Sequence, residues 1–137
     1  MAITVRQEQG KVPVTILSIY GKLDASNYRA VIASAQGAHD QGARDLLIDM
    51  SDVPFMSSSG IVALHTIVLI FRGEGSSEPE SGWEALHALD RDRSSGVQEH
   101  VKLLKPQPRV MSTLEKTGLD AFFNIYDERE EAISSFT

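Results

Sequence analysis

The sequence predicts an α/β fold in which helices cover a mixed β-sheet. Two observations carry this prediction: the chain opens with two strand-like segments joined by a short turn, and after residue 20 strand patterns alternate with helix patterns. Such alternation gives parallel strand pairs joined by right-handed crossovers, whereas the opening hairpin is antiparallel. With 137 residues, 42% of them hydrophobic, the chain is long enough to bury a core as one domain spanning residues 1–137.

The opening hairpin is predicted from two segments, ITVRQEQ (residues 3–9) and VPVTILSIY (residues 12–20), which read as β-strands. Gly10 and Lys11 lie between them. Glycine at the first central position suits a two-residue hairpin turn. We therefore expect the chain to reverse direction at these two residues.

The first helix is predicted from Ser26 to about Gln41, because apolar residues recur there near helical spacing, and Gly42 is placed to end it. The next segment, RDLLIDM (residues 44–50), is a continuous apolar run of the kind that forms strands buried on both faces of a sheet. Together with the second strand of the hairpin, these two elements predict one strand–helix–strand unit.

The remaining elements continue the alternation. We expect a helix from about Ser58 to Arg72, a strand at 100–106, a helix at 108–118, a strand at 121–126 and a helix at 127–136. Gly118 is placed to end the helix before it. Asp127 and Glu130 have the spacing of a capping box, which predicts the start of the last helix.

Residues 73–100 interrupt this pattern as an acidic, Gly- and Ser-rich insertion. They contain seven acidic residues and two arginines, a net charge of −5 in a chain whose total is −6. A connection of this length inside a compact domain is unusual and should be either functional or disordered. Only WEALHAL (residues 83–89) looks able to form a helical turn or two.

The helix expected at 58–72 is apolar around nearly its whole circumference, so it must be covered on all sides. The sheet covers one face, and a patch that includes Leu64 and Val68 needs a second cover. We favour the insertion itself as that cover, through Trp83, Leu86 and Leu89. The alternative is a partner surface, which includes a second copy of the chain in a homodimer.

Several functional classes are disfavoured by composition. The chain has no cysteine, and its N-terminus lacks the basic and apolar regions of a signal peptide, so we expect a cytoplasmic protein. The longest apolar run, residues 61–71, is about half of the ~20 residues that cross a bilayer, so no membrane span is expected. The net charge of −6 argues against nucleic acid as a partner.

Catalysis is also disfavoured. The serines do not lie in a Gly-x-Ser-x-Gly motif, and the chain has no glycine-rich phosphate-binding loop. The four histidines show no spacing typical of metal ligands. We therefore expect no enzyme activity, no cofactor and no metal site.

The segment DMSDVPFMSSSGIVALH (residues 49–65) places three adjacent hydroxyls, those of Ser57, Ser58 and Ser59, where the second helix begins. One interpretation is that serine only caps the helix and that Gly60 allows a close backbone approach. The other is that one hydroxyl is a phosphorylation switch. The spacing of the serines leaves both interpretations open.

Three segments in order, GKLD (21–24), LLIDMSDVPFMSSSG (46–60) and KPQPRVMSTLEKTGL (105–119), resemble the anti-sigma factor antagonist family, the STAS domains of bacteria. The resemblance covers nearly all of the chain except residues 73–100. It implies a STAS fold, with a mixed sheet of four to five strands covered by about four helices. It also implies a regulatory serine at the start of the second helix.

Within that family the signature usually reads Met-Asp-Ser-Ser/Thr-Gly, and the serine after the aspartate accepts phosphate. Matching the motifs gives Ser58 the role of phospho-acceptor, with Ser59 and Gly60 after it. Ser57 stands where the family usually has aspartate. Asp24 matches the acidic residue of the family's Gly-x-Leu-Asp turn, which lies near the serine.

The resemblance thus implies an anti-sigma factor antagonist, a partner-switching regulator of transcription. Without phosphate it would capture an anti-sigma factor serine kinase. Phosphorylation of Ser58 would cancel the capture, and a cognate phosphatase would restore it. Two alternatives remain open: a non-phosphorylated STAS interaction subunit and a small-molecule sensor.

Overall fold

The computed structural model describes residues 2–73 and 98–137. Five strands form one sheet in the order β1-β2-β3-β4-β5, so that each strand lies beside its neighbour in sequence. The strands are β1 (Ala2–Gln9), β2 (Pro13–Tyr20), β3 (Leu46–Asp52), β4 (Val101–Leu104) and β5 (Ile125–Tyr126). β1 runs antiparallel to β2, and every later pair is parallel. The predicted mixed sheet with an opening hairpin is confirmed.

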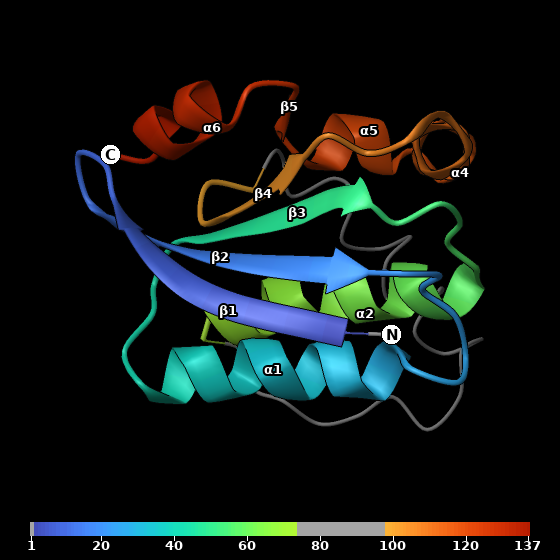
Figure 1. The fold of residues 1–137 in the computed structure, drawn as a ribbon, viewed down its shortest axis with the longest axis horizontal. Helices are drawn as coiled ribbons and strands as arrows, with labels where there is room; N and C mark the ends of the chain where they lie inside the picture. The colour runs from blue at the N-terminus through green and yellow to red at the C-terminus, as the bar shows by residue number, and fades with distance from the viewer. Residues whose placement is uncertain (1, 74–97) are drawn as a thin grey trace.

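Helices cover both faces of this sheet (Figure 1). They are α1 (Tyr28–Asp40), α2 (Ser58–Phe71), α4 (Pro108–Thr117), α5 (Leu119–Phe122) and α6 (Arg129–Ser135). α1 and α2 lie side by side on one face, and α6 lies on the other (Figure 1). The structure therefore has the α/β fold class expected from the sequence.

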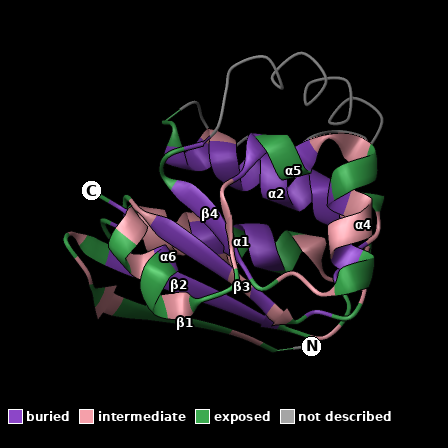
Figure 2. Ribbon diagram, turned by 90° about the horizontal axis from the view of Figure 1, so that it is seen from above, coloured by how far each residue is buried: buried purple, intermediate pink, exposed green. Residues whose placement is uncertain are grey.

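The strands carry apolar residues on both faces and so build two cores. Leu17 of β2 and Ile48 of β3 belong to the larger core, together with residues of α1, α2, α4 and α5. Their chain neighbours Ile16 and Leu47 point to the opposite face and pack with α6. Successive side chains of a strand alternate between faces, so a continuous apolar run supplies both cores. Figure 2 shows these central strands as buried along most of their length.

The smaller core holds α6 through a buried lysine. The Lys102 ammonium donates to the Ser135 carbonyl oxygen over 3.2 Å and to its hydroxyl over 3.0 Å. It also lies 4.5 Å from the centre of the Phe136 ring. A cation at the carboxyl end of a helix interacts favourably with the helix dipole. Lys102 thus fixes the last helical turn against β4.

The strand predicted at 121–126 is largely wrong. Gly118 ends α4 in the left-handed conformation, as predicted, but α5 then follows at Leu119–Phe122 and only Ile125–Tyr126 joins the sheet. Phe122 and Phe123 are both buried in the larger core, with ring centres 5.1 Å apart. Adjacent side chains of a strand point to opposite faces, so a strand could not place both rings in one core.

The predicted start of the last helix and the predicted hairpin turn also differ from the structure. α6 begins at Arg129 after Glu128, with no side-chain cap hydrogen bond, so the predicted capping box of Asp127 is wrong. The hairpin link spans residues 10–12, one residue longer than predicted, and Gly10 has no positive φ. A Cβ on Gly10 would lie 2.8 Å from Ile133, so this glycine allows α6 to approach the hairpin.

The helix α2 is buried on almost every side, as its apolar sequence predicts. Leu64 and Val68 have no exposed surface and belong to the larger core. Val62 and Thr66 are buried as well, and the Thr66 hydroxyl donates to the Val62 carbonyl oxygen over 2.8 Å. The predicted cover by Trp83, Leu86 and Leu89 lies outside the described residues and stays a prediction.

Candidate functional site

The loops that follow β2 and β3 lie together at the carboxyl end of the sheet. Gly21 N donates to the Asp52 carbonyl oxygen over 3.0 Å, and Leu23 N donates to that of Phe55 over 3.0 Å. Ser57 N donates to the Leu23 carbonyl oxygen over 2.9 Å. These main-chain bonds continue the β2–β3 pairing beyond the strands. They bring the segment that contains Asp24 against the start of α2.

The three serines divide their roles at this helix start. Ser57 is the N-cap residue in extended conformation, and its hydroxyl accepts a hydrogen bond from Ser59 N over 3.2 Å. Ser58 is the first helical residue and is exposed, whereas Ser57 and Ser59 are half-buried. In the part of the chain that the structure describes, no residue hydrogen-bonds the Ser58 hydroxyl. The capping interpretation thus holds for Ser57 and leaves Ser58 accessible.

Gly60 is buried where the loop packs under α2. A Cβ built at this residue would lie 2.2 Å from Met56 Cγ and 3.1 Å from Leu23 Cγ. Gly60 therefore allows the helix to lie directly on the paired loops. This close approach fixes the position of the neighbouring serines.

Asp24 forms a turn ahead of α1 and does not cap that helix. Its carboxylate accepts hydrogen bonds from Ser26 N over 2.9 Å and from the Ser26 hydroxyl over 2.5 Å. Asn27 is the N-cap residue of α1, without a side-chain cap bond. The two hydrogen bonds from Ser26, and then the charge of Lys22, hold the pKa of Asp24 below its ordinary value of 3.8. Asp24 therefore presents a fixed negative charge at neutral pH.

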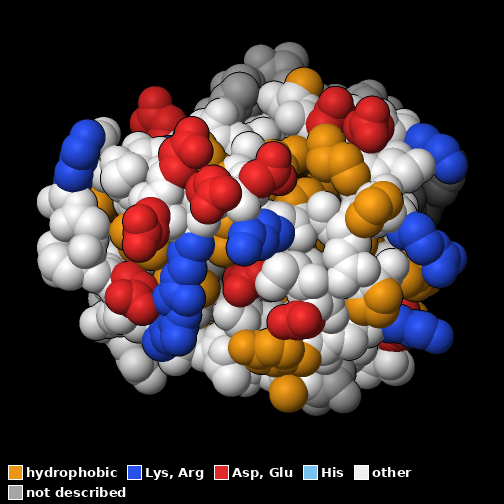
Figure 3. Space-filling view, turned by 45° about the horizontal axis from the view of Figure 1, so that its top comes forward, with side chains coloured by type: hydrophobic (Ala, Val, Ile, Leu, Met, Phe, Trp, Pro, Cys, Tyr) orange, Lys and Arg blue, Asp and Glu red, His pale blue; other side chains and the backbone are white. Residues whose placement is uncertain are grey.

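A third loop, residues 105–107, lies at this end of the molecule, and its position beside the other two was not predicted from the sequence. Gln107, just ahead of α4, donates from its amide to the Ser51 carbonyl oxygen over 2.8 Å. The Arg109 guanidinium lies 5.1 Å from the centre of the half-buried Phe55 ring. The sequence signals for this contact were the motif at 105–119 and the prolines of the two loops, Pro54, Pro106 and Pro108. On the right of Figure 3, the end that carries α4, hydrophobic and basic side chains lie close together.

Other kinds of site find little support in the described ranges. No group of three or more His, Asp and Glu side chains within residues 2–73 and 98–137 is placed to hold a metal ion. None of the helices in these ranges combines the length and hydrophobicity needed to cross a bilayer. What the arrangement does offer is an exposed hydroxyl at a helix N-terminus, beside a carboxylate-bearing turn.

The N-cap role of Ser57 is testable by stability. We expect Ser57→Ala to lower the free energy of unfolding by about 1 kcal/mol, because Ser59 N loses its partner. Ser57→Asp should stay close to the parent, since aspartate caps equally well. Urea unfolding followed by circular dichroism measures both. A Ser57→Ala protein as stable as the parent would show that this cap bond contributes nothing.

Asp24 should support recognition more than folding. We expect Asp24→Asn to melt close to the parent at neutral pH, because the side chain forms only its own exposed turn. Because the pKa of Asp24 is lower in the folded state, its ionised carboxylate stabilises the fold above about pH 3.8. This contribution is lost as the pH falls through the pKa of the folded state. The small difference in Tm should therefore vanish in acid, which melting curves at several pH values would show. A difference that grows in acid would contradict this assignment.

Comparison with known proteins gives the family. The family model of the STAS domain matches residues 3–75, so the chain belongs to the STAS domain family. This range includes the paired loops and the whole of α2. No curated protein matches the sequence.

Solved structures share the fold over most of the chain. TM1081 of Thermotoga maritima is 18% identical with a TM-score of 0.71, covering 98% of this chain and 93% of its own. An anti-sigma factor antagonist from Mycobacterium paratuberculosis is 19% identical with a TM-score of 0.66, covering 98% and 94%. The STAS domain of a SulP transporter from Vibrio cholerae is 19% identical with a TM-score of 0.55, covering 89% and 77%.

Proposed function

We propose that this chain is an anti-sigma factor antagonist whose partner binding is controlled by phosphorylation of Ser58. The observation that carries the proposal is the placement of Ser58. Its hydroxyl is exposed at the first position of α2, while Ser57 supplies the cap. Among the similar structures is the Bacillus cell fate determinant SpoIIAA in its phosphorylated form, which supports a phosphorylated state of this fold.

The proposed switch works through charge. A phosphoserine carries about −1.5 to −2 charges at neutral pH, and the N–H groups and dipole of a helix N-terminus tolerate this charge. The fold would therefore keep its stability. A partner docked over the uncharged Ser58 would instead meet a dianion close to the Asp24 carboxylate. Repulsion and the cost of desolvating the phosphate would expel it.

The proposed partner is an anti-sigma factor serine kinase in the cytoplasm, with a cognate phosphatase that removes the phosphate. Its docking surface would be the end of the molecule formed by the three loops. This end combines Ser58 with apolar surface at Phe55 and the cation of Arg109. Aromatic residues and arginine are enriched in protein interfaces, which supports this choice.

Incubation with such a kinase and ATP tests the proposal. Intact mass spectrometry should show one added phosphate, and fragmentation should place it on Ser58. The same phosphorylated protein should no longer bind the kinase in a pull-down. Phosphate on Ser59 alone, or unchanged binding after phosphorylation, would refute the proposed mechanism.

The likeness to a SulP transporter STAS domain supports a second candidate, a non-phosphorylated STAS interaction subunit. In that case Ser58 would stay unmodified in cells, and Ser58→Glu would leave partner binding unchanged. The third alternative, a small-molecule sensor, has a candidate pocket elsewhere in the described residues. The pocket lined by Val5 and Gln41 lies between β1 and α1, away from the start of α2 where the candidate site lies.

A further inference from the structure

The first strand, β1, forms an exposed edge of the sheet. It stands at the end of the strand order, and its eight residues are exposed or half-buried throughout. Val5 leaves 45% of its surface in contact with solvent. An edge strand of this length carries a row of main-chain groups that can pair with another strand. Natural edge strands are often protected by proline or by bulges, and β1 has neither.

The register shows which main-chain groups point outward. Thr15 N donates to the Asp45 carbonyl oxygen over 2.9 Å, so the main chain of Thr15 faces β3. Gln7 lies opposite Thr15 in the antiparallel pair. In such a pair, residues that do not hydrogen-bond each other point their N–H and C=O groups away from the partner strand. The main-chain groups of Gln7 therefore point to the free edge, as do those of Val5 and Gln9 by alternation.

Charges on one face of β1 are arranged with opposite signs two residues apart. The Arg6 guanidinium lies 3.7 Å from the Glu8 carboxylate. Arg129 of α6 binds the same carboxylate over 2.8 Å. This end of the edge therefore holds two cations and one anion, although the chain as a whole carries −6. Two copies of this cluster attract only in a register that sets the Arg6 guanidinium of one copy against the Glu8 carboxylate of the other.

We propose that β1 pairs with β1 of a second copy of this chain, antiparallel and centred on Gln7. A twofold pair that uses the outward groups can be centred on Val5, Arg6 or Gln7. Centring on Arg6 places two arginines directly opposite each other, which is destabilising. Centring on Val5 or on Gln7 forms equal numbers of ladder bonds within residues 2–9. Only the Gln7 centre places Arg6 opposite Glu8 of the second copy, twice, so charge complementarity selects it.

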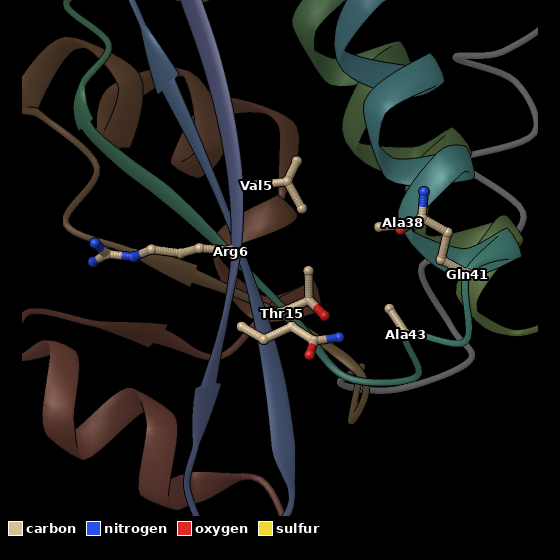
Figure 4. Close-up of a pocket in the computed structure, with 7 residues that line it drawn as sticks. Val5, Arg6, Thr15, Ala38, Gln41 and Ala43 are labelled. Atoms are coloured by element: carbon tan, nitrogen blue, oxygen red, sulfur yellow. The ribbon is translucent and has the colours of Figure 1, made fainter.

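A pocket beside β1 fits the side chains that this pairing would bring. It has a volume of about 380 Å³ and is lined by Val5, Arg6, Gln7, Thr15, Ala38, Gln41 and Ala43. Figure 4 shows Val5 pointing toward α1, while Arg6 points to the opposite side of the strand. Gln9 of the second copy would lie opposite Val5, on the same face. Its methylene groups would pack against Val5, whose side chain lines the pocket.

Single-cysteine variants test this register cleanly, because the chain has no cysteine of its own. In a pair centred on Gln7, the two copies of residue 7 lie opposite each other at about 5.5 Å between Cα atoms, within reach of a disulfide. Under mild oxidation, Gln7→Cys should form a covalent dimer much faster than Val5→Cys, Arg6→Cys or the exposed control Ser134→Cys. Faster cross-linking of Val5→Cys would overturn the proposed pairing.

Gln7→Pro gives an independent test of the same edge. Proline removes an N–H that points away from β2, so the hairpin keeps its own hydrogen bonds. We expect the parent to sediment as a concentration-dependent dimer and Gln7→Pro to sediment as a monomer with a nearly unchanged Tm. A parent protein that stays monomeric at its highest soluble concentration would overturn the proposal. Both tests are independent of phosphorylation, so the proposed function can fail without affecting this result.

Discussion

Replacing Ser58 by glutamate is expected to weaken binding of the proposed anti-sigma factor partner by about tenfold to a hundredfold. A buried like charge or an unpaired carboxylate in an interface costs about 1.4 to 3 kcal/mol, which corresponds to this change. The fold should be unaffected, because an acidic side chain is favourable in the first turn of a helix. Binding measured by calorimetry or surface plasmon resonance, with Tm measured in parallel, separates the two effects.

Two further variants sharpen this experiment. Ser58→Ala should keep full binding and lose all phosphorylation, because it removes only the exposed hydroxyl of the proposed acceptor. Ser59→Glu is the matched control, since it adds the same charge one residue later, on the half-buried Ser59. Equal losses of binding for the two glutamate variants would mean that general acidity, and not the Ser58 position, governs the partner. Full binding by Ser58→Glu would exclude a charge switch at this residue.

Replacing Gly60 by alanine is expected to destabilise the protein by about 1 to 3 kcal/mol, the usual cost of overpacking a core. The new Cβ would lie 2.2 Å from Met56 Cγ, so the Met56 side chain must move. Leu23 Cγ would lie 3.1 Å from the same Cβ, so a second side chain must also shift. For a chain of this size, the loss should appear as a drop of several degrees in Tm.

Gly37 provides the control for this prediction. It also lies inside a helix, α1, but a Cβ at this position would meet no other atom within 4 Å. Gly37→Ala should therefore stabilise the protein by about 0.5 to 1 kcal/mol through the higher helix propensity of alanine. Opposite signs for the two substitutions would confirm that close packing, and not helix propensity, requires Gly60. Two similar gains would show that the Met56 side chain moves aside without cost.

Much of the fold could be predicted because, within each segment, the spacing of the apolar residues and the length of the segment indicated the same kind of element. The apolar run of α2 is too long for a typical strand, and β3 falls between two helical patterns, so each had one consistent assignment. The region of Phe122 and Phe123 could not be resolved in this way, because a short apolar run suits a strand and a helical turn equally. Tertiary packing decided it, since both rings enter one core.

The sequence predicted where the candidate site lies, but it did not predict which side chains contact each other there. The adjacent serines and Gly60 marked the start of α2, and the motif placed Asp24 in the loop that now lies beside it. The contact of Gly60 with Met56 and Leu23 depends on how the helix lies on the loops, which no local pattern encodes. The pairing of Phe55 with Arg109 joins residues 54 positions apart and was missed for the same reason.

The strand order of the sheet has a consequence for synthesis. Because each strand lies beside the one before it in sequence, the sheet can grow from one edge as the chain leaves the ribosome. No strand must wait for a later one to be inserted between its neighbours. β4 and β5 are then added in turn to the edge that β3 leaves open. The hairpin and α1, together with β3 and α2, could thus form a partly folded unit before the last 40 residues are made.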